Sequence, residues 1–503
     1  MTAPTTPTPP PTQPTLPTPP IELLGHGERL AGSRVPVSGD VLARLGSVCE
    51  TLTAPDDIAE SSRDWWPLAL HWALAGMVPA AAAAVCRPTS AEQVAAILAI
   101  ATREQIPVTP AGGRSGVCGA SVPVHGGIVL DLTAIHGVVS VDDVSLVAEV
   151  LPGTFGPDYE AHLRSQGCTG GHWPQSMDIS TVGGWLACRG AGQYSTRYGK
   201  IEDMVVGLEV VLADGRIIRT GGAPRAAAGP DLSQLFVGAE GTLGVITRAW
   251  LRIHPAPAAE RRAAFAFATF ESGLDACRRI LRRGATPAVL RLYDGPESAR
   301  SHGTDGTDCV LLVLDEGDPV IVDAVLAIVG EECASARPLD VELVERWVHH
   351  RNETSALQSL TRKGFVVDTM EIAAPWAALP RIFDDTRAAM LAVPHARAAT
   401  CHLSHSYTDG ACLYFTFAAT PPAEEVESTY VALWDTGTRA VLGAGGNLSH
   451  HHGVGLNRSR FAAEALGPAH DVLTSVKAAL DPAGILNPGK LGLPSPFGEV
   501  PWP

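Results

Sequence analysis

The stretch CTGGHWPQSMDISTVGGWLACRGAGQYSTRYGKIEDMV spans residues 168–205. Residues 167–199 are rich in Gly, Ser and Thr and form the longest loop-like segment inside the core. Long segments of this composition inside a domain bring backbone amides close to a ligand, because buried amides without a partner are costly. Two further glycine-rich stretches flank it, PAGGRSGVCGA (110–120) and DLSQLFVGAEGTLGVIT (231–247). The first follows a predicted strand and is a candidate diphosphate loop, since closely spaced glycines let N–H groups converge on an anion.

The glycines of the 110–120 loop stand at 112, 113, 116 and 119, which is not the GxGxxG spacing, and no clear helix opens directly after them. A nicotinamide-binding Rossmann domain is therefore disfavoured. Taken alone, the loop is also compatible with an ordinary turn. Its meaning depends on the two later stretches.

Around these loops, the apolar residues alternate with the periods of helices and strands. In the first half of the chain we expect helices at 90–103 and 157–166, a hairpin at 207–222, and strands at 106–110, 126–132, 145–153 and 245–255. A Pro-containing stretch at 255–262 marks a boundary. Strand–helix alternation resumes from about 263 to 400, with helices near 271–284 and 319–332, and a further helix follows at 423–440. The pattern predicts the α+β class.

The composition excludes several classes of function. Of the 503 residues, 37 are Lys or Arg and 53 are Asp or Glu, so the net charge is −16 and broad nucleic-acid binding is not expected. The 46% hydrophobic content excludes a mostly disordered chain. Ten scattered cysteines without a CxxC pair indicate reduced thiols and a cytoplasmic protein. A small-molecule substrate is expected, and a homodimer is left open.

The most apolar window runs from Trp65 to Cys86 and is long enough to cross a bilayer. Pro67, His71 and Pro79 interrupt it, and a capped helix of a water-soluble domain follows. We therefore expect a buried helix followed by a core strand, and no membrane span.

Taken in order, the glycine-rich blocks resemble the FAD-binding domain shared by vanillyl-alcohol oxidase and p-cresol methylhydroxylase. The resemblance covers about residues 86–490 and is strongest to the alkylglycerone-phosphate synthase (alkyl-dihydroxyacetonephosphate synthase) family. The motifs that carry it are STVGGW (180–185), YGKIEDMVV (198–206), GAEGTLGVIT (238–247), LRLYD (290–294), DGACLYF (409–415) and GGNLSHHHGVG (445–455).

The resemblance implies a two-subdomain FAD-binding domain of the p-cresol methylhydroxylase type and an α+β cap, or substrate, domain. A C-terminal segment would return to the flavin. The expected division is a disordered Thr/Pro-rich tail at 1–20, an N-terminal helical segment at 21–85, the FAD-binding domain at 86–257, the cap at 258–400, the C-terminal catalytic segment at 401–495 and a tail at 496–503.

The resemblance also assigns the cofactor residues. The diphosphate loop would be Pro110, Ala111, Gly112, Gly113, Arg114, Ser115 and Gly116. The rest of the flavin would meet His172, Gln175, Ser176, Met177, Asp178, Ile179, Ser180, Thr181, Cys188, Arg189, Gly190, Ala191, Glu240, Gly241, Thr242, Leu243, Gly244, Val245 and Ile246. Residues 110–120 lack the histidine, and 172–181 the cysteine, to which relatives attach flavin covalently, so non-covalent FAD is expected.

For catalysis, the resemblance points to Tyr414 and Arg291 and to the three histidines His450, His451 and His452. In an extended segment, side chains at 450 and 452 would share one face while 451 points to the other. Clustered histidines also suit a metal. However, Tyr414 stands where related 2-hydroxy-acid dehydrogenases carry a ligand histidine, so no metal is expected.

Two departures from the synthase pattern put the substrate in doubt. The arginine that recognises the substrate phosphate falls near Leu357-Gln358 in this chain, and neither residue is cationic. Arg351, Arg362 or Lys363 could substitute from a shifted register, although each is more often a solvated charge. The CRxT-like segment reads Cys401-His402-Leu403-Ser404. Loss of a planar phosphate clamp changes the preferred ligand. The expected activity is synthase-like flavin chemistry on a small carbonyl or hydroxy substrate, with Tyr and His moving protons. The alternative is an FAD-linked oxidoreductase, an oxidase or dehydrogenase, acting on an alcohol or D-2-hydroxy acid.

Overall fold

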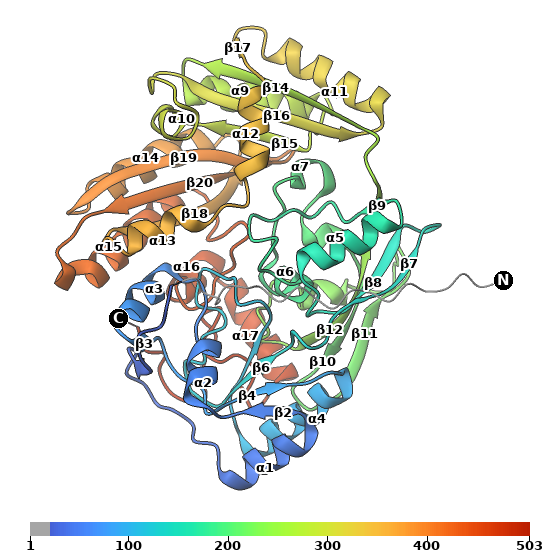
Figure 1. Ribbon diagram of the computed structural model, residues 1–503, viewed down its shortest axis with the longest axis vertical. Coiled ribbons are helices and arrows are strands. Elements are labelled where there is room, and N and C mark those ends of the chain that lie inside the picture. The colour runs from blue at the N-terminus through green and yellow to red at the C-terminus, as the bar shows by residue number, and fades with distance from the viewer. Residues whose placement is uncertain (1–20, 503) are drawn as a thin grey trace.

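The computed structural model describes residues 21–502, and the predicted tail at 1–20 lies outside the described residues. Figure 1 shows two lobes: a lower one built from the N-terminal, central and C-terminal parts of the chain, and an upper one built from the yellow and orange segments. Three larger sheets with helices packed against them, and two sheets of two short strands each, make up the two lobes, which confirms the α+β class.

The first sheet of the lower lobe carries the 110–120 loop. Its order is β2 (Glu50–Leu52), β4 (Ala84–Arg87), β6 (Ile128–Asp131), β5 (Val108–Ala111), with the last three strands parallel. The predicted helix at 90–103 is α4 (Ala91–Glu104), which begins where the Ser90 side chain accepts a hydrogen bond from the Gln93 amide. Its apolar stripe joins the core beneath this sheet, together with α1 (Gly39–Val48).

The second sheet of the lower lobe is antiparallel. Its order is β11 (Ile217–Gly221), β10 (Val205–Val211), β12 (Val245–Arg252), β8 (Val147–Val150), β7 (Val138–Asp142). Gly215, with a φ of 86°, makes the turn of the predicted hairpin. This sheet packs on α5 (Gly156–Ser165), α6 (Val182–Cys188) and α8 (Ile201–Met204), and η1 (Leu232–Leu235) follows the hairpin.

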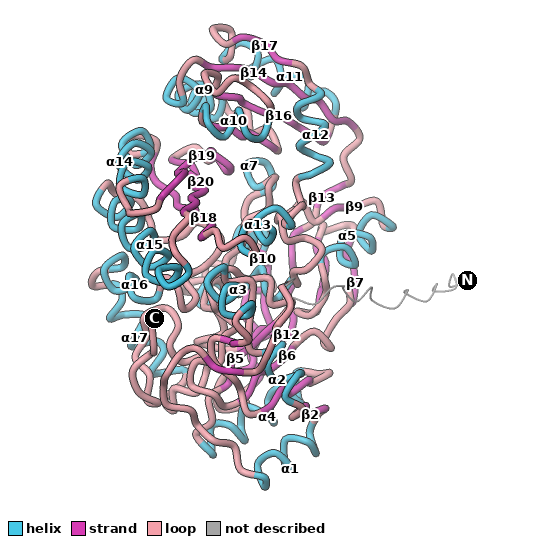
Figure 2. The backbone as a smooth tube through the Cα atoms, turned by 60° about the vertical axis from the view of Figure 1, so that its left-hand side comes forward, coloured by secondary structure: helices cyan, strands magenta, loops and turns pink. Residues whose placement is uncertain are grey.

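The upper lobe is built on a seven-stranded antiparallel sheet (Figure 2). Its order is β17 (Arg337–Leu339), β14 (Ala259–Phe267), β16 (Cys309–Gly317), β15 (Val289–Tyr293), β19 (Ala396–Ser406), β20 (Gly410–Ala419), β18 (Val366–Pro375). Packed on it are α9 (Phe270–Arg282), α11 (Pro319–Glu332), α14 (Leu379–Leu391) and α15 (Val426–Gly443); the other helices of the lobe are α10 (Gly295–His302), α12 (Glu342–His350), α13 (Ser355–Thr361) and η2 (Ala423–Glu425).

Alternation along these strands separates the cap core from the site. In β15, Leu290 and Leu292 join the core beneath the packed helices. Arg291 and Tyr293 lie on the opposite face of the sheet, where they line a cavity between the two lobes. In β20, Leu413 likewise joins that core, and its neighbour Tyr414 lines the cavity. The seven-stranded sheet therefore presents a polar face to the lower lobe.

After the cap, the chain returns to the lower lobe through α16 (Ser459–Leu466) and α17 (Ala469–Leu480). Ile485 and Leu486 join the core of the first sheet, and the Asn487 amide donates to the carbonyl of Val108 in β5 over 2.8 Å. The expected division at residue 400 falls inside β19, and both β19 and β20 belong to the cap sheet.

The structure can be compared with two further predictions, on the apolar window and on the loop-like stretch. In the apolar window, α3 (Pro67–Leu74) is largely buried and is followed by β3 (Met77–Val78) and the core strand β4; no helix among residues 21–502 is long and apolar enough to cross a membrane. The loop-like stretch at 167–199 is less irregular than expected, because it contains α6 and α7 (Ser195–Tyr198). The short elements β1 (Gly27–Glu28), β9 (Cys168–Thr169), β13 (His254–Pro255) and α2 (Pro55–Ser61) complete the fold.

Candidate active site

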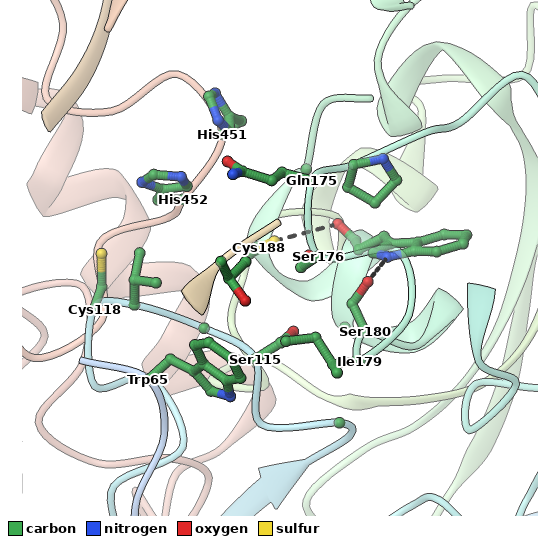
Figure 3. Close-up of a pocket in the computed structure, with 18 of the residues that line it drawn as sticks. Trp65, Ser115, Cys118, Gln175, Ser176, Ile179, Ser180, Cys188, His451 and His452 are labelled. Carbon is green, nitrogen blue, oxygen red and sulfur yellow. Dashed lines mark hydrogen bonds between the residues drawn. The ribbon is translucent and has the colours of Figure 1, made fainter. Parts of the chain in front are cut away.

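A cavity of about 620 Å³ lies between the two lobes and is bounded by all three glycine-rich stretches and by the cap. Figure 3 shows His451 and His452 on one side of it, Gln175 facing them, and Trp65 with Ser115 below. The volume is within the range of cofactor and ligand sites. The fold thus brings segments from most of the chain to one place.

Glycine is required in the first loop because the second stretch packs directly on it. A Cβ at Gly112 would overlap the Thr181 hydroxyl, and one at Gly113 would overlap the carbonyl oxygen of Ile179. Arg114 follows with a φ of 52°, and its buried Nε has no hydrogen-bond partner within residues 21–502. The loop therefore presents backbone and a cation to the cavity, as a diphosphate requires.

The second stretch supplies buried polar groups to the same cavity. Thr181 caps α6 by accepting from the Gly184 amide, and Trp185 Nε1 donates to Ser180 Oγ over 2.6 Å. His172 lies beside Trp185; both of its ring nitrogens are buried and without a partner in the described part of the chain. Burial lowers the pKa of His172 to about 3, so the ring is neutral and can accept or donate.

The third stretch links the cavity to the C-terminal segment. Glu240 is buried, and its carboxylate accepts from the amides of Val454 at 2.6 Å and Gly455 at 2.9 Å. Burial raises the pKa of Glu240, and these two amides oppose the rise. The Asn487 side chain donates to the Glu240 carbonyl over 2.7 Å. The three contacts fix the loop that carries Gly241 against the cavity.

Most predicted cofactor residues line the cavity: Pro110, Ala111, Gly112, Gly113, Arg114, Ser115, Gly116, His172, Gln175, Ser176, Ile179, Ser180, Thr181, Cys188, Gly190, Ala191, Glu240, Gly241, Gly244, Val245 and Ile246. Five do not. Met177 and Leu243 pack in the core of the second sheet, Asp178 is exposed, Arg189 pairs with Glu202, and the Thr242 hydroxyl donates to Ala239.

Trp65, Pro67 and Leu70 also line the cavity, which the sequence pattern did not predict. The Trp65 amide donates to the carbonyl of Gly116 over 2.9 Å, and its buried indole Nε1 lacks a hydrogen-bond partner among the described residues. These residues stand in the apolar window, where their pattern is that of ordinary core. Their role depends on a contact with a distant loop.

Tyr414 faces the cavity from β20, opposite Glu371 of β18 and His402 of β19. Its hydroxyl donates to Thr369 Oγ1 over 3.0 Å, and its ring stacks on His402 with a centroid separation of 4.8 Å. Burial raises the pKa of Tyr414 well above its usual value. The hydroxyl is therefore protonated, and it can donate its single proton to an oxygen of a ligand in place of Thr369.

The three histidines do not alternate as expected, because residues 448–453 form bends instead of a strand. His450 Nδ1 and His451 Nδ1 lie 2.9 Å apart, and His452 Nδ1 lies 3.1 Å from the buried carboxylate of Glu371. That carboxylate also accepts from the amides of His451 and His452 and pairs with Arg458. His451 and His452 line the cavity, and His450 lies behind them.

A hydrogen-bonded relay runs behind the histidines. His450 Nε2 contacts the Tyr407 hydroxyl at 2.9 Å, that hydroxyl lies 3.3 Å from Ser195 Oγ, and Ser195 Oγ lies 2.8 Å from His405 Nδ1. Burial lowers the pKa values of His405, His450 and His451 well below the usual range. All three imidazoles are therefore neutral at pH 7.

The same three histidines are the one group within residues 21–502 that could hold a metal ion, since one ligand atom of each lies within 4.8 Å of the others. The two Nδ1 atoms of His450 and His451 are 2.9 Å apart, as in a hydrogen bond. Two nitrogens on a tetrahedral zinc would be about 3.3 Å apart. The absence of a metal stays a prediction.

Arginine side chains complete the cap side of the cavity. Arg291 Nε donates to the Tyr293 hydroxyl over 2.8 Å, and its guanidinium lies 5.7 Å from the Trp347 ring. Leu357 and Gln358, at the place of the phosphate arginine, line the cavity without a charge. Arg351 lines it too; its guanidinium lies 4.7 Å from the Tyr194 ring, and its buried Nη1 has no hydrogen-bond partner in the described chain.

The cavity fits FAD by the chemistry of its walls. The glycine loop leaves no room for a Cβ, and unpartnered donors or acceptors of Trp65, Arg114 and His172 surround the space next to it. Buried polar atoms are normally satisfied, so these groups indicate a large polar ligand. Residues 110–116 would hold the diphosphate, and the 172–181 and 240–246 segments would hold the rest.

Two family models match successive parts of this chain. Residues 82–221 match the family model described as "FAD binding domain", and residues 256–491 match "FAD linked oxidases, C-terminal domain". FAD-linked oxidoreductase YgcU of Escherichia coli (strain K12) is 32% identical over 81% of this chain and 88% of its own length. Alkyldihydroxyacetonephosphate synthase of Dictyostelium discoideum is 30% identical over 83% of this chain and 74% of its own length.

Solved structures agree on the fold. A structure of alkyldihydroxyacetonephosphate synthase superposes with a TM-score of 0.76 at 24% identity, covering 93% of this chain and 89% of that one. Substrate-bound p-cresol methylhydroxylase superposes with a TM-score of 0.75 at 18% identity, covering 92% and 99%. The predicted resemblance is thereby confirmed. The chain belongs to the FAD-linked oxidoreductase family, with the FAD-binding fold of p-cresol methylhydroxylase, and FAD is its cofactor.

Proposed function

We propose that this protein is an FAD-dependent oxidoreductase that oxidises the hydroxyl group of a small 2-hydroxy acid. The proposal is carried by two groups that line the same cavity. One is Arg351, whose guanidinium Nη1 has no hydrogen-bond partner among the described residues, and the other is His451, whose neutral ring can accept a proton. FAD, when bound, supplies the acceptor for the hydride that leaves the substrate carbon.

Arg351 would bind the substrate carboxylate. A buried guanidinium nitrogen without a partner is costly, and a carboxylate satisfies it with charge-assisted hydrogen bonds. The rings of Trp173 and Tyr194, at 5.4 and 4.7 Å, hold the guanidinium in place. The resemblance places the phosphate arginine near Leu357 and Gln358, which are uncharged, and Arg351 would supply a cation to the same cavity wall.

His451 would take the hydroxyl proton. Its ring is neutral, it faces the cavity, and its Nδ1 contacts His450, through which the proton can reach the Tyr407–Ser195–His405 relay. Tyr414, which stays protonated, would hold the substrate oxygen by donating a hydrogen bond. Arg291, on the same wall, would stabilise negative charge on that oxygen.

The second candidate is the synthase-type exchange that the sequence resemblance predicts, with no net oxidation. It is favoured by the presence of Tyr414, Arg291 and the three histidines at the motif positions of that family, and by the 30% identity to a synthase. The uncharged Leu357 and Gln358 disfavour the phosphate-bearing substrate that the synthase name specifies.

Anaerobic mixing of the purified holoenzyme with a panel of D- and L-2-hydroxy acids tests the proposal. We expect at least one acid to cause a lasting loss of flavin absorbance that returns when an electron acceptor is added. In Arg351→Met the KM for that acid should rise by about tenfold or more, and Arg362→Met, on a more exposed side chain, serves as the matched control. Turnover without an acceptor and without loss of absorbance would favour the exchange reaction instead.

A further inference from the structure

His402 stands in β19 between Cys401 and Leu403, which both join the cap core. Strand alternation therefore turns its side chain towards the catalytic face of the sheet, behind the cavity wall. It is only 4% exposed and does not itself line the cavity, whereas its neighbours Arg291, Glu297 and Tyr414 do. The residue is buried among catalytic candidates without touching the ligand space.

The hydrogen bonds of His402 fix its tautomer. Nε2 lies 2.6 Å from Arg291 Nη2, and a guanidinium nitrogen can only donate, so Nε2 must be the unprotonated acceptor. Nδ1 then carries the proton and donates to Glu297 Oε1 over 2.9 Å. The chain Glu297–His402–Arg291 consequently has a single direction, in which a carboxylate orients an imidazole and the imidazole orients a cation.

The surrounding charges keep the ring neutral. Burial, followed by repulsion from Arg291, lowers the pKa of His402 to about 4, although Glu297 opposes both effects. Burial disfavours the Glu297 carboxylate, but attraction to His402, Arg300 and Arg291 outweighs it and lowers the pKa of Glu297 to about 2. The other groups that face this cluster are the Tyr293 and Tyr414 rings and His302.

The ring also supports the catalytic tyrosine. The His402 and Tyr414 rings are nearly parallel, with a 19° angle and a 4.8 Å centroid separation, and the two residues are directly paired across β19 and β20. The Thr400 hydroxyl donates to the second Glu297 oxygen over 3.1 Å, which holds the carboxylate in turn. The His402 side chain thus contacts both Arg291, the cation proposed to stabilise the substrate oxyanion, and Tyr414, the proposed hydrogen-bond donor.

We propose that His402 is a positioning residue, which uses its neutral imidazole, oriented by Glu297, to aim Arg291 and to support the Tyr414 ring at the substrate oxygen. The proposal rests on the proposed function, because Arg291 and Tyr414 act on that substrate. The synthase family that this sequence resembles has a CRxT-like motif in this segment, with Arg at the position of His402. An arginine has no acceptor and would repel Arg291, so the arrangement depends on histidine.

The first test needs no substrate. In holoenzyme labelled with ¹⁵N-histidine, the His402 signals, assigned by their loss in His402→Gln, should report the neutral Nδ1–H tautomer from pH 6 to 9. An Nε2–H tautomer or a charged ring at pH 7 would overturn the proposal, since neither can accept from Arg291. This result stands even if the protein oxidises no hydroxy acid, in which case only the proposed function fails.

The second test separates positioning from packing. In His402→Gln the side-chain oxygen can accept from Arg291 and the amide can donate to Glu297, so KM for the hydroxy acid should stay within about threefold of the wild type. In His402→Leu both bonds are lost, and KM should rise by about tenfold or more, with FAD content unchanged. His254→Leu, a substitution on β13 outside the cavity lining, is the matched control.

A Leu variant with unchanged KM would contradict the positioning role. Equal losses in the Gln and Leu variants would contradict it as well, because they would show that the ring shape matters and the hydrogen bonds do not. A fall in FAD content in parallel with activity would indicate that His402 serves only the fold.

Discussion

At the residue scale, the environment of Tyr414 sets its chemistry. Its hydroxyl donates to Thr369 Oγ1, and burial raises its pKa well above the usual value, so that it is protonated at neutral pH. Tyr414→Phe removes this donor and little else, so kcat should fall by about 100-fold while FAD content stays constant. Steady-state kinetics on the hydroxy acid found by anaerobic mixing measure the effect.

Thr369→Val is the control for this substitution, because it removes the partner of the hydroxyl and keeps the tyrosine. Its kcat should change by less than about tenfold. If Tyr414→Phe retained the wild-type kcat, the tyrosine would be part of the cap packing and not of the reaction.

At the scale of the elements, the contact between the first two glycine-rich loops decides whether FAD binds. Gly113→Ala places a methyl group against the Ile179 carbonyl, which belongs to a fixed loop, so the two loops must separate. We expect FAD affinity to fall by about 100-fold or more, as measured by flavin fluorescence during reconstitution. Gly46→Ala, where nothing lies within 4 Å of the added Cβ, should bind FAD normally.

The elements also show what the sequence could predict. The glycine spacing in 110–116 predicted a backbone-lined loop, because close backbone approach follows from local geometry. Arg291 came from the family resemblance alone, and the alternation of β15 places it on the cavity face. The alternation expected for His450–His452 is wrong, since the Glu371 carboxylate on a distant strand gathers the amides of 451 and 452 into a bend. Trp65 could not be found, because an apolar side chain in a cavity wall has the same local pattern as one in the core.

At the scale of the whole molecule, the mode of FAD attachment is testable directly. The first loop lacks the histidine, and residues 172–181 lack the cysteine, to which the relatives that the sequence resembles attach flavin covalently. Precipitation of the holoenzyme with acid should therefore leave all the flavin in the supernatant, with the absorbance of free FAD. Colour retained in the pellet would point to an attachment by another group, with Cys118 and Cys188 as the nearest candidates in the cavity wall.

Acid stability is a second property of the whole molecule. Burial lowers the pKa of His71 in α3 to about 4, below the unfolded value near 6.5. The unfolded chain therefore binds this proton first, and the contribution of the neutral ring is present above pH 6.5 and is lost as the pH falls towards 4. The free energy of unfolding should drop by up to about 1.4 kcal/mol per pH unit on this account.

Comparison with His71→Gln isolates that contribution, because all other groups are common to both proteins. In urea titrations, the difference in unfolding free energy between wild type and variant should shrink as the pH falls from 6.5 to 4. A difference that does not depend on pH would mean that His71 is solvated in the folded protein.

The return of the chain from the cap to the first sheet has a consequence for biosynthesis. Asn487 donates hydrogen bonds to the carbonyls of Glu240 and Val108, and Lys490 donates to the carbonyl of Val122. Residues near 490 therefore hold in place segments that were synthesised several hundred residues earlier. A nascent chain can fold its first sheet on the ribosome, yet the FAD site stays unfinished until the C-terminal segment has emerged. Cofactor capture should accordingly follow the emergence of this segment, and chains stalled before residue 485 should be colourless.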